Sequence, residues 1–274
     1  MKKDMAANED RTIGKSPPLL EFENITVMKG GRKVLDSISV TIQEGENVAI
    51  LGPNGSGKSS FIKAVTREYY PLLRQGLSFK IRGRDRCDVF EMRSLFGIVT
   101  PDLQYRFHRD LFGRDVILSG FFSSVGLYNR EITPDMEKRA DRILSFLEIE
   151  DLKDRTMDSM SSGEARRFLI GRALVHCPKT LILDEPTTSL DLHALHSFRA
   201  VLRKIARSGT GIIMVTHNIH DIIPEISRVI LMKEGRFWKD GSKTEILSSH
   251  NISGLFQAPV RIREEGGYYY ATGY

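Results

Sequence analysis

Apolar and polar residues alternate near the N-terminus, from Leu19 to Ile42. Such alternation predicts strands with one buried face, and Gly30-Gly31 in the middle predicts a tight turn. We therefore expect an antiparallel pair of strands here. Two more short strands are expected at Leu77–Ile81 and Phe96–Val99.

Continuous apolar runs, rather than alternating ones, mark a second group of expected strands. They lie at Asn47–Leu51, Thr180–Asp184, Gly211–His217 and Arg228–Gly235. Strands of this kind are buried on both faces, as in a parallel sheet whose connections are helices. The pattern therefore predicts an α/β protein.

The region from about Leu103 to Ser159 has helical character. Within Asp135–Ile149, Ala140 and Leu144 recur at a helical spacing of four. Pro134 is a suitable first residue for that helix. A further helix is expected after Asn47–Leu51, with Phe61, Val65 and Tyr69 on one face.

Composition excludes several classes of protein. The chain has 274 residues, of which 41% are hydrophobic and 27% charged, which are globular values. Its net charge of +5 comes from basic and acidic residues that are interleaved, so no nucleic-acid partner is expected. No apolar run reaches the ~18 residues of a membrane span. Two cysteines without metal spacing favour a reducing cytosol.

Both ends of the chain are expected to lie outside the main domain. Residues 1–18 are polar, lack the apolar core of a signal peptide and end in Pro17-Pro18, which predicts a disordered tail. Residues 251–274 form a C-terminal extension with several tyrosines, which is predicted to be poorly ordered.

A phosphate-binding loop follows the strand at Asn47–Leu51. Its sequence, GPNGSGKSS, fits the pattern G-x-x-x-x-G-K-[ST], in which glycine backbone amides surround phosphate oxygens at a helix N-terminus. Lys58 is expected to reach the β- and γ-phosphates, and Ser59 to ligate Mg²⁺. The candidate nucleotide-binding residues are Gly52, Pro53, Asn54, Gly55, Ser56, Gly57, Lys58, Ser59 and Ser60.

Two carboxylates end one of the expected buried strands, where ligands of open α/β sheets bind. Asp184 can hold Mg²⁺ through oxygen, and Glu185 can orient or deprotonate the attacking water. His217 ends another buried strand, where it can hydrogen-bond the γ-phosphate. Lys58, Glu185 and His217 are therefore the candidate catalytic residues.

Taken together, these motifs resemble those of the ABC (ATP-binding cassette) superfamily. The resemblance covers about residues 19–247. Gly52–Ser60 matches Walker A, and Leu181–Glu185 matches Walker B. Ser161-Ser162-Gly163-Glu164 matches the signature turn, Ser189-Leu190-Asp191 the D-loop, and His217 the switch histidine.

The resemblance implies a P-loop NTPase fold. Its RecA-like core would carry an antiparallel β subdomain and an α-helical subdomain inserted at about residues 103–159, within a cassette spanning 19–250. It also implies ATP and Mg²⁺ as cofactors and a head-to-tail homodimer. In that dimer Ser161, Gly163 and Asp191 would serve the ATP held by the partner chain.

On the same resemblance, the chain would energise a transmembrane permease, with uptake favoured. It would be cytoplasmic and peripheral on the inner face of the cell membrane. A soluble, non-transport ABC ATPase is the alternative. Val116–Tyr128 and Ile98–Gln104 look similar to molybdenum-transport or photorepair-type proteins, and the apolar segment 116–127 is either subdomain core or a docking face.

Four positions depart from the family pattern. Lys29 replaces an aromatic residue that usually stacks on adenine, so the stacking contact either comes from Phe22 or is absent. Asp102 stands where a metal-contacting glutamine is usual, and Gln104 follows two residues later, so either could serve Mg²⁺. The signature turn carries Ser162 and Glu164 where glycine and glutamine are commoner, and we expect Glu164 to point away from phosphate.

Overall fold

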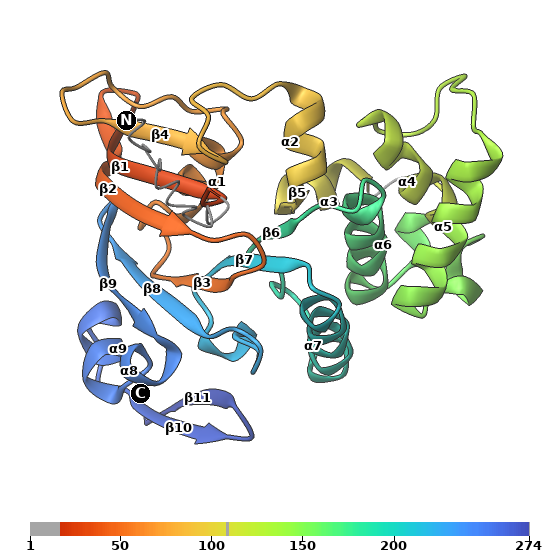
Figure 1. The fold of residues 1–274 in the computed structure, drawn as a ribbon. Helices are drawn as coiled ribbons and strands as arrows, with labels where there is room; N and C mark the ends of the chain where they lie inside the picture. The colour runs from red at the N-terminus through yellow and green to blue at the C-terminus, as the bar shows by residue number, and fades with distance from the viewer. Residues whose placement is uncertain (1–16, 108–109, 274) are drawn as a thin grey trace, which may run out of the picture.

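The computed structural model describes residues 17–107 and 110–273, apart from the side chain of Val89 (Figure 1). Most of the tail predicted for residues 1–18 lies outside these residues. The strands are β1 Leu20–Lys29, β2 Arg32–Ile42, β3 Asn47–Leu51, β4 Ser78–Ile81, β5 Phe96–Val99, β6 Thr180–Asp184, β7 Gly211–Thr216, β8 Arg228–Lys233, β9 Arg236–Ser242, β10 Arg261–Glu265 and β11 Tyr268–Thr272. The α-helices are α1 Lys58–Val65, α2 Val89–Leu95, α3 Pro101–Phe107, α4 Gly113–Ser119, α5 Pro134–Leu147, α6 Ser162–Leu174, α7 Leu192–Arg207, α8 Lys243–Ile246 and α9 Ser249–Phe256.

A six-stranded sheet forms the centre of the molecule, in the order β5-β6-β7-β3-β8-β9. Its neighbouring strands are parallel except for β9, which pairs antiparallel with β8 at the edge. Every residue of β6 and β7 is buried. The expected parallel sheet, buried on both faces, is therefore confirmed.

A second, three-stranded antiparallel sheet has the order β2-β1-β4. It confirms the strand pair expected from the alternation between Leu19 and Ile42, and β4 adds a third strand (Figure 1). Phe22 on β1 packs against Phe61 of α1 and Phe79 of β4. The two sheets thereby share a core around α1.

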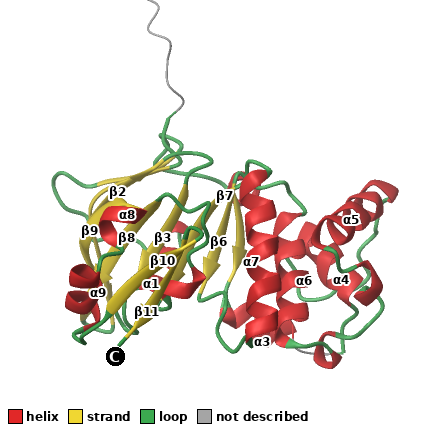
Figure 2. Ribbon diagram, turned by 90° about the horizontal axis from the view of Figure 1, so that it is seen from below, coloured by secondary structure: helices red, strands yellow, loops and turns green. Residues whose placement is uncertain are grey.

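Helices α3 to α6 form a separate group to one side of the sheets (Figure 2). Helix α5 begins as expected: the Thr133 hydroxyl accepts a hydrogen bond from the Met136 amide, and Pro134 follows the cap. Within the apolar segment 116–127, Val116, Ile117 and Leu118 are buried. This part of the segment is subdomain core and not an exposed docking face.

Helix α1 is shorter than predicted, because it ends at Val65 and does not reach Tyr69. Arg67 then adopts a left-handed backbone, with φ of 61°. Its guanidinium donates to the carbonyl of Phe79 at 2.8 Å and lies 3.8 Å from the centroid of the Phe79 ring. Because Arg67 makes these contacts with β4 from a non-helical conformation, they favour ending α1 before Arg67.

The prediction of a poorly ordered C-terminal extension is wrong. Residues Ser249–Phe256 form α9, and β10 and β11 pair as an antiparallel hairpin beneath the edge of the main sheet (Figure 1). Ile252, Leu255 and Tyr269 are buried in the main core. Apolar burial therefore orders this segment.

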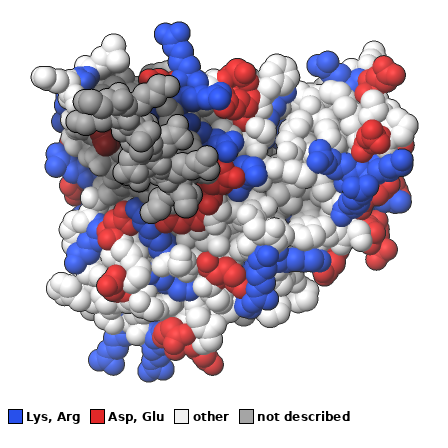
Figure 3. Space-filling model, viewed as in Figure 1, with Lys and Arg blue, Asp and Glu red and all other residues white. Residues whose placement is uncertain are grey.

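Charged side chains of both signs are interspersed over the face drawn in Figure 3. In the part of the chain that the structure describes, no helix is long and apolar enough to cross a membrane.

Candidate nucleotide site

The phosphate loop connects the end of β3 to the start of α1, as its sequence predicts. Gly55 and Gly57 have φ of 78° and 109°, a region that residues with a Cβ rarely occupy. A Cβ on Gly57 would also lie 2.7 Å from the carbonyl oxygen of Val34. The loop therefore requires glycine at this position for both backbone shape and space.

Lys58 points its ammonium group back into the loop. Its Nζ donates to the carbonyl oxygens of Gly52 at 2.8 Å and Pro53 at 3.0 Å, and forms an ion pair with Glu185 Oε1 at 3.2 Å. An ammonium group has three donors, so these three acceptors satisfy it. The side chain is only 5% exposed, and this pairing allows its burial.

Glu185 connects Lys58 to His217. It has φ of 48°, and its amide donates to the carbonyl of Val215 on β7 at 2.9 Å. A left-handed backbone is costly for a residue with a Cβ, so the surrounding bonds must hold this turn. One carboxylate oxygen faces Lys58, and the other is hydrogen-bonded to Nδ1 of His217.

Asp184 lies at the end of β6 and accepts a hydrogen bond from the Ser59 hydroxyl at 3.3 Å. The pKa of Asp184 is raised to about 6, chiefly by burial and also by the negative charge of Glu185, while the hydrogen bond from the Ser59 hydroxyl offsets part of the rise. At neutral pH this carboxyl is mostly ionised. A hydroxyl and a carboxylate at this separation are the hard oxygen donors that Mg²⁺ prefers, so these residues fit the metal.

Asp102 and Gln104 have different surroundings. Gln104 Oε1 accepts hydrogen bonds from Arg166, including one from Nε at 3.1 Å, and is directed at α6. Asp102 is exposed, and its negative charge helps to raise the pKa of Asp184. Of the two candidates for the metal, Asp102 therefore has the electrostatic link to Asp184.

The signature turn lies apart from these groups. Ser161 caps α6: its hydroxyl accepts from the Glu164 amide at 3.3 Å, and the Glu164 carboxylate accepts from the Ser161 amide at 2.8 Å. The carboxylate of Glu164 thus turns back onto its own helix terminus. A hollow of about 100 Å³ beside the turn is lined by residues of α6 and α7 and by none from the phosphate loop.

Comparison with known proteins identifies this arrangement. A family described as "ABC transporter" matches residues 35–188, more than half of the chain. The chain belongs to the ABC transporter family. It is therefore an ABC-type ATP-binding and ATP-hydrolysing subunit.

Similar individual proteins belong to the same family. The uncharacterized ABC transporter ATP-binding protein YlmA of Bacillus subtilis is 30% identical over 251 residues, 89% of this chain and 93% of that protein. The cobalt import ATP-binding protein CbiO of Rhodobacter capsulatus is 32% identical over 233 residues, 84% of this chain and 81% of that protein. A similar solved structure is the dimer of the cassette MJ0796 in a post-hydrolysis state with ADP and Pi, with TM-score 0.66, 25% identity, and coverage of 81% and 98%.

The D-loop of this ABC cassette packs against the signature turn. Asp191 caps α7 by accepting a hydrogen bond from the Ala194 amide at 2.7 Å. The Ser162 hydroxyl donates to the carbonyl of Ser189 at 3.4 Å. The departure at Ser162 therefore adds a contact between the signature turn and the D-loop.

Phe22 does not have the position needed to stack on adenine. Its side chain is 1% exposed and packs between Phe61 and Phe79, so no ring face is free for a base. The Phe22 alternative is therefore wrong, because alternation along β1 places this residue on the buried face of the strand.

Two buried polar residues of the cassette escaped sequence reasoning. Arg166 donates to the carbonyls of Pro186 and Thr188 as well as to Gln104. Asp221 accepts hydrogen bonds from the hydroxyls of Thr187 and Thr216, and burial raises its pKa. Arg166 shares a helix face with Gly163 and Ile170, and that spacing is the signal that could have revealed its burial.

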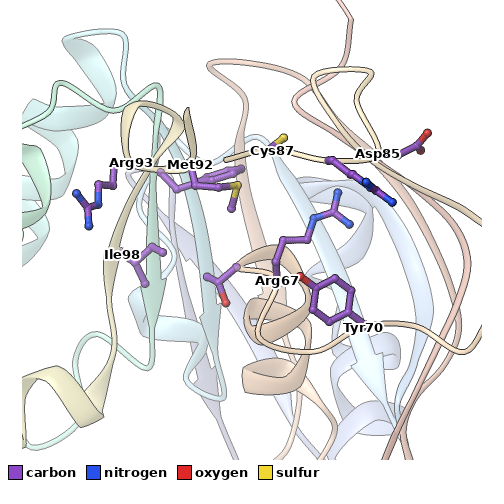
Figure 4. A pocket seen from close by; sticks show the side chains of 10 residues that line it. Arg67, Tyr70, Asp85, Cys87, Met92, Arg93 and Ile98 are labelled. Atoms are coloured by element: carbon purple, nitrogen blue, oxygen red, sulfur yellow. The ribbon is translucent and has the colours of Figure 1, made fainter. Parts of the chain in front are cut away.

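One large cavity lies away from the phosphate loop. It has a volume of about 580 Å³ and lies between the end of α1, the 85–87 segment, α2 and β5. Arg67 extends into it between Tyr70 and Met92 (Figure 4). An adjoining hollow of about 340 Å³ shares Arg93, Phe96 and Ile98 with it and reaches the helical subdomain.

The Arg166 contacts predict a coupled loss of stability and activity. Replacing Arg166 with Ala leaves the carbonyls of Pro186 and Thr188 unpaired, which should lower the free energy of unfolding by about 2–3 kcal/mol. Because Gln104 and the backbone that follows Glu185 lose a shared anchor, kcat for ATP should fall as well. Urea unfolding and steady-state ATPase assays measure the two effects. Arg142→Ala, at an exposed position on α5, is the control. An Arg166→Ala protein with unchanged stability and kcat would refute this role of the Arg166 contacts.

Proposed function

We propose that this cassette hydrolyses ATP at two composite sites in a head-to-tail homodimer and powers uptake through a membrane permease. The observation that carries the proposal is the Glu185 carboxylate. It is held between Lys58 and His217 at the end of β6, next to a glycine-rich phosphate loop. This set of groups has the chemistry that phosphoryl transfer to water requires.

In the proposed reaction, the β- and γ-phosphates of ATP bind the loop amides and Lys58. The phosphates then compete with Glu185 for the ammonium group. Once released from Lys58, the Glu185 carboxylate can accept a proton from the attacking water, which adds to the γ-phosphorus as ADP leaves. His217, bonded to the second carboxylate oxygen through Nδ1, keeps that carboxylate in position.

Mg²⁺ is proposed as the cofactor, held by Ser59 and Asp184 with Asp102 nearby. The ion would neutralise charge on the phosphate oxygens. Gln104 is the weaker candidate, because its side-chain oxygen already accepts from Arg166.

A dimer is proposed because the signature turn is separated from the phosphate loop in this chain. Ser161 and Gly163 stand at the N-terminus of α6, where amides and the helix dipole favour an anion. In a head-to-tail pair, this terminus and Asp191 would approach the nucleotide on the partner's phosphate loop. The dimer of MJ0796 supports the proposal.

A permease is proposed as the second partner, docking over the two adjoining hollows at α2 and β5. Their walls carry Arg67, Arg86 and Arg93 around apolar Phe96 and Ile98, and Phe90 beside them is 78% exposed. An amphipathic permease segment with an acidic residue would fit this lining. The subunit would then be cytoplasmic and peripheral on the inner face of the membrane.

The proposed direction is uptake, since similar proteins include ATP-binding subunits named for import of cobalt, petrobactin and hemin. A metal oxyanion or an iron complex is the proposed cargo class. The oxyanion option rests on the narrower likeness to molybdenum-transport or photorepair-type proteins.

Replacing Glu185 with Gln tests the composite sites. The amide keeps the size of the side chain but cannot take a proton, so turnover should fall by about 100-fold or more. ATP and Mg²⁺ should then convert the variant to dimers, as measured by light scattering after gel filtration. Lys58→Ala should remain monomeric under the same conditions. A Glu185→Gln protein that binds ATP yet stays monomeric would contradict the dimer.

Reversing the charge at Arg93 tests the permease surface. Wild-type cassette purified from detergent-solubilised native membranes should carry a polytopic membrane protein in a fixed ratio. Arg93→Glu should lose that protein while keeping the ATPase activity of the isolated cassette. Arg261→Glu on β10 reverses the charge of an exposed arginine away from this surface, and this control variant should still carry the membrane protein. Retention by Arg93→Glu would rule out this surface, and a wild-type cassette without any such protein would favour the soluble ATPase.

A further inference from the structure

The C-terminal extension contacts the segment that follows the switch histidine. After His217, the chain forms a short 3₁₀ turn at Ile219–Asp221, and strand β11 packs beside this turn. The ring of Tyr270 on β11 lies 5.5 Å from the ring of His220, measured between centroids. The extension, which the sequence predicts to be poorly ordered, is therefore in contact with a loop of the catalytic site.

Helix α7 joins the same contact. The guanidinium of Arg199 donates to the carbonyl of His220. It also lies 5.0 Å from the centroid of the Tyr268 ring, and the guanidinium of Arg203 lies 5.9 Å from the same ring. A cation over an aromatic face is attracted to it, so Tyr268 helps to hold the arginine that binds the 3₁₀ turn.

A buried lysine fixes the other end of this segment. Lys243 is 9% exposed, and its Nζ donates to the carbonyls of Ile223 at 3.3 Å, Pro224 at 2.9 Å and Gly267 at 3.2 Å. Gly267 precedes β11, so one ammonium group ties the extension to the chain directly after the 3₁₀ turn. Lys243 therefore anchors both the C-terminal hairpin and the segment that follows His217, which is called the switch segment below.

The inner side of the switch segment is held as well. Asp221 accepts hydrogen bonds from Thr187, which follows Glu185 by two residues, and from Thr216 on β7. The segment is thus fixed to the catalytic core on one side and to the extension on the other. Between His217–His220 and the extension there remains a cavity of about 250 Å³, bordered by Ile252, Phe256 and Val260. That space would allow the segment to shift if its outer contacts were lost.

We propose that Tyr268 and Tyr270 are positioning residues for the switch histidine. They hold the Ile219–Asp221 turn from the outside, so that His217 Nδ1 stays in contact with the Glu185 carboxylate. The inference rests on the proposed role of His217 and Glu185 in hydrolysis. It assigns the C-terminal hairpin a part in turnover and not in nucleotide binding, because the tyrosine contacts described above involve no residue of the phosphate loop.

The test compares ring removal with ring retention in the full chain. Tyr270→Ala and Tyr268→Ala should each lower kcat about tenfold, since small misplacements of catalytic groups are costly. KM for ATP should stay within about twofold, because ATP contacts at Lys58 are unchanged. Tyr270→Phe keeps the ring beside His220 and should retain wild-type kcat. Arg263 is an exposed residue of β10 that pairs with Tyr270 across the hairpin. Arg263→Ala changes the hairpin without removing a tyrosine ring, so it should also behave as wild type.

Activity is expressed per folded molecule, with ATP binding and the melting temperature measured in parallel. Folded alanine variants that lose thermal stability but keep wild-type kcat would overturn the proposal. If Tyr270→Ala does not fold, His220→Ala removes the same ring contact from the other side and should give the same loss of kcat. Wild-type kcat in a folded His220→Ala protein would equally overturn it. A wild-type cassette no more active than Lys58→Ala would instead refute the proposed function itself.

Discussion

The ion pair between Lys58 and Glu185 is the interaction on which the catalytic site depends. It joins the phosphate loop to the end of β6, and the second oxygen of Glu185 extends the connection to His217 after β7. The strand order makes this possible, because β6 and β3 are both direct neighbours of β7 and run parallel to it. Carboxyl ends of parallel strands meet at one edge, so three distant sequence positions become neighbours.

Buried polar contacts then connect this centre to the rest of the cassette. Arg166 reaches from α6 to Gln104 and to the backbone that follows Glu185. Burial lowers the pKa of Arg166 to about 10, so it remains charged at neutral pH and needs all of these acceptors. A movement of the helical subdomain would have to break these bonds or carry them along. This geometry gives a physical route by which the signature helix and the hydrolysis site can influence each other.

The central sheet and the phosphate loop could be predicted because their signals are local. Continuous apolar runs gave β6 and β7, and the glycine spacing gave the loop. The prediction failed where tertiary contacts decide the outcome. The apolar residues of the extension enter the main core, although β10 is mostly charged. Arg67 ends α1 early through its contact with Phe79. The surroundings of Gln104 depended on Arg166, which lies 62 residues away in sequence.

Mixing two inactive variants tests the central claim, that each site needs two chains. Lys58→Ala removes the phosphate-loop cation. Gly163→Asp places a side chain and a negative charge at the signature turn, where an added Cβ would lie 2.9 Å from Ala194 Cβ. Each variant alone should be inactive. In a mixed dimer, one site combines an intact phosphate loop with an intact signature turn, so an equimolar mixture should recover ATPase activity that neither variant shows alone. Mixed dimers that form but hydrolyse no ATP would contradict the account.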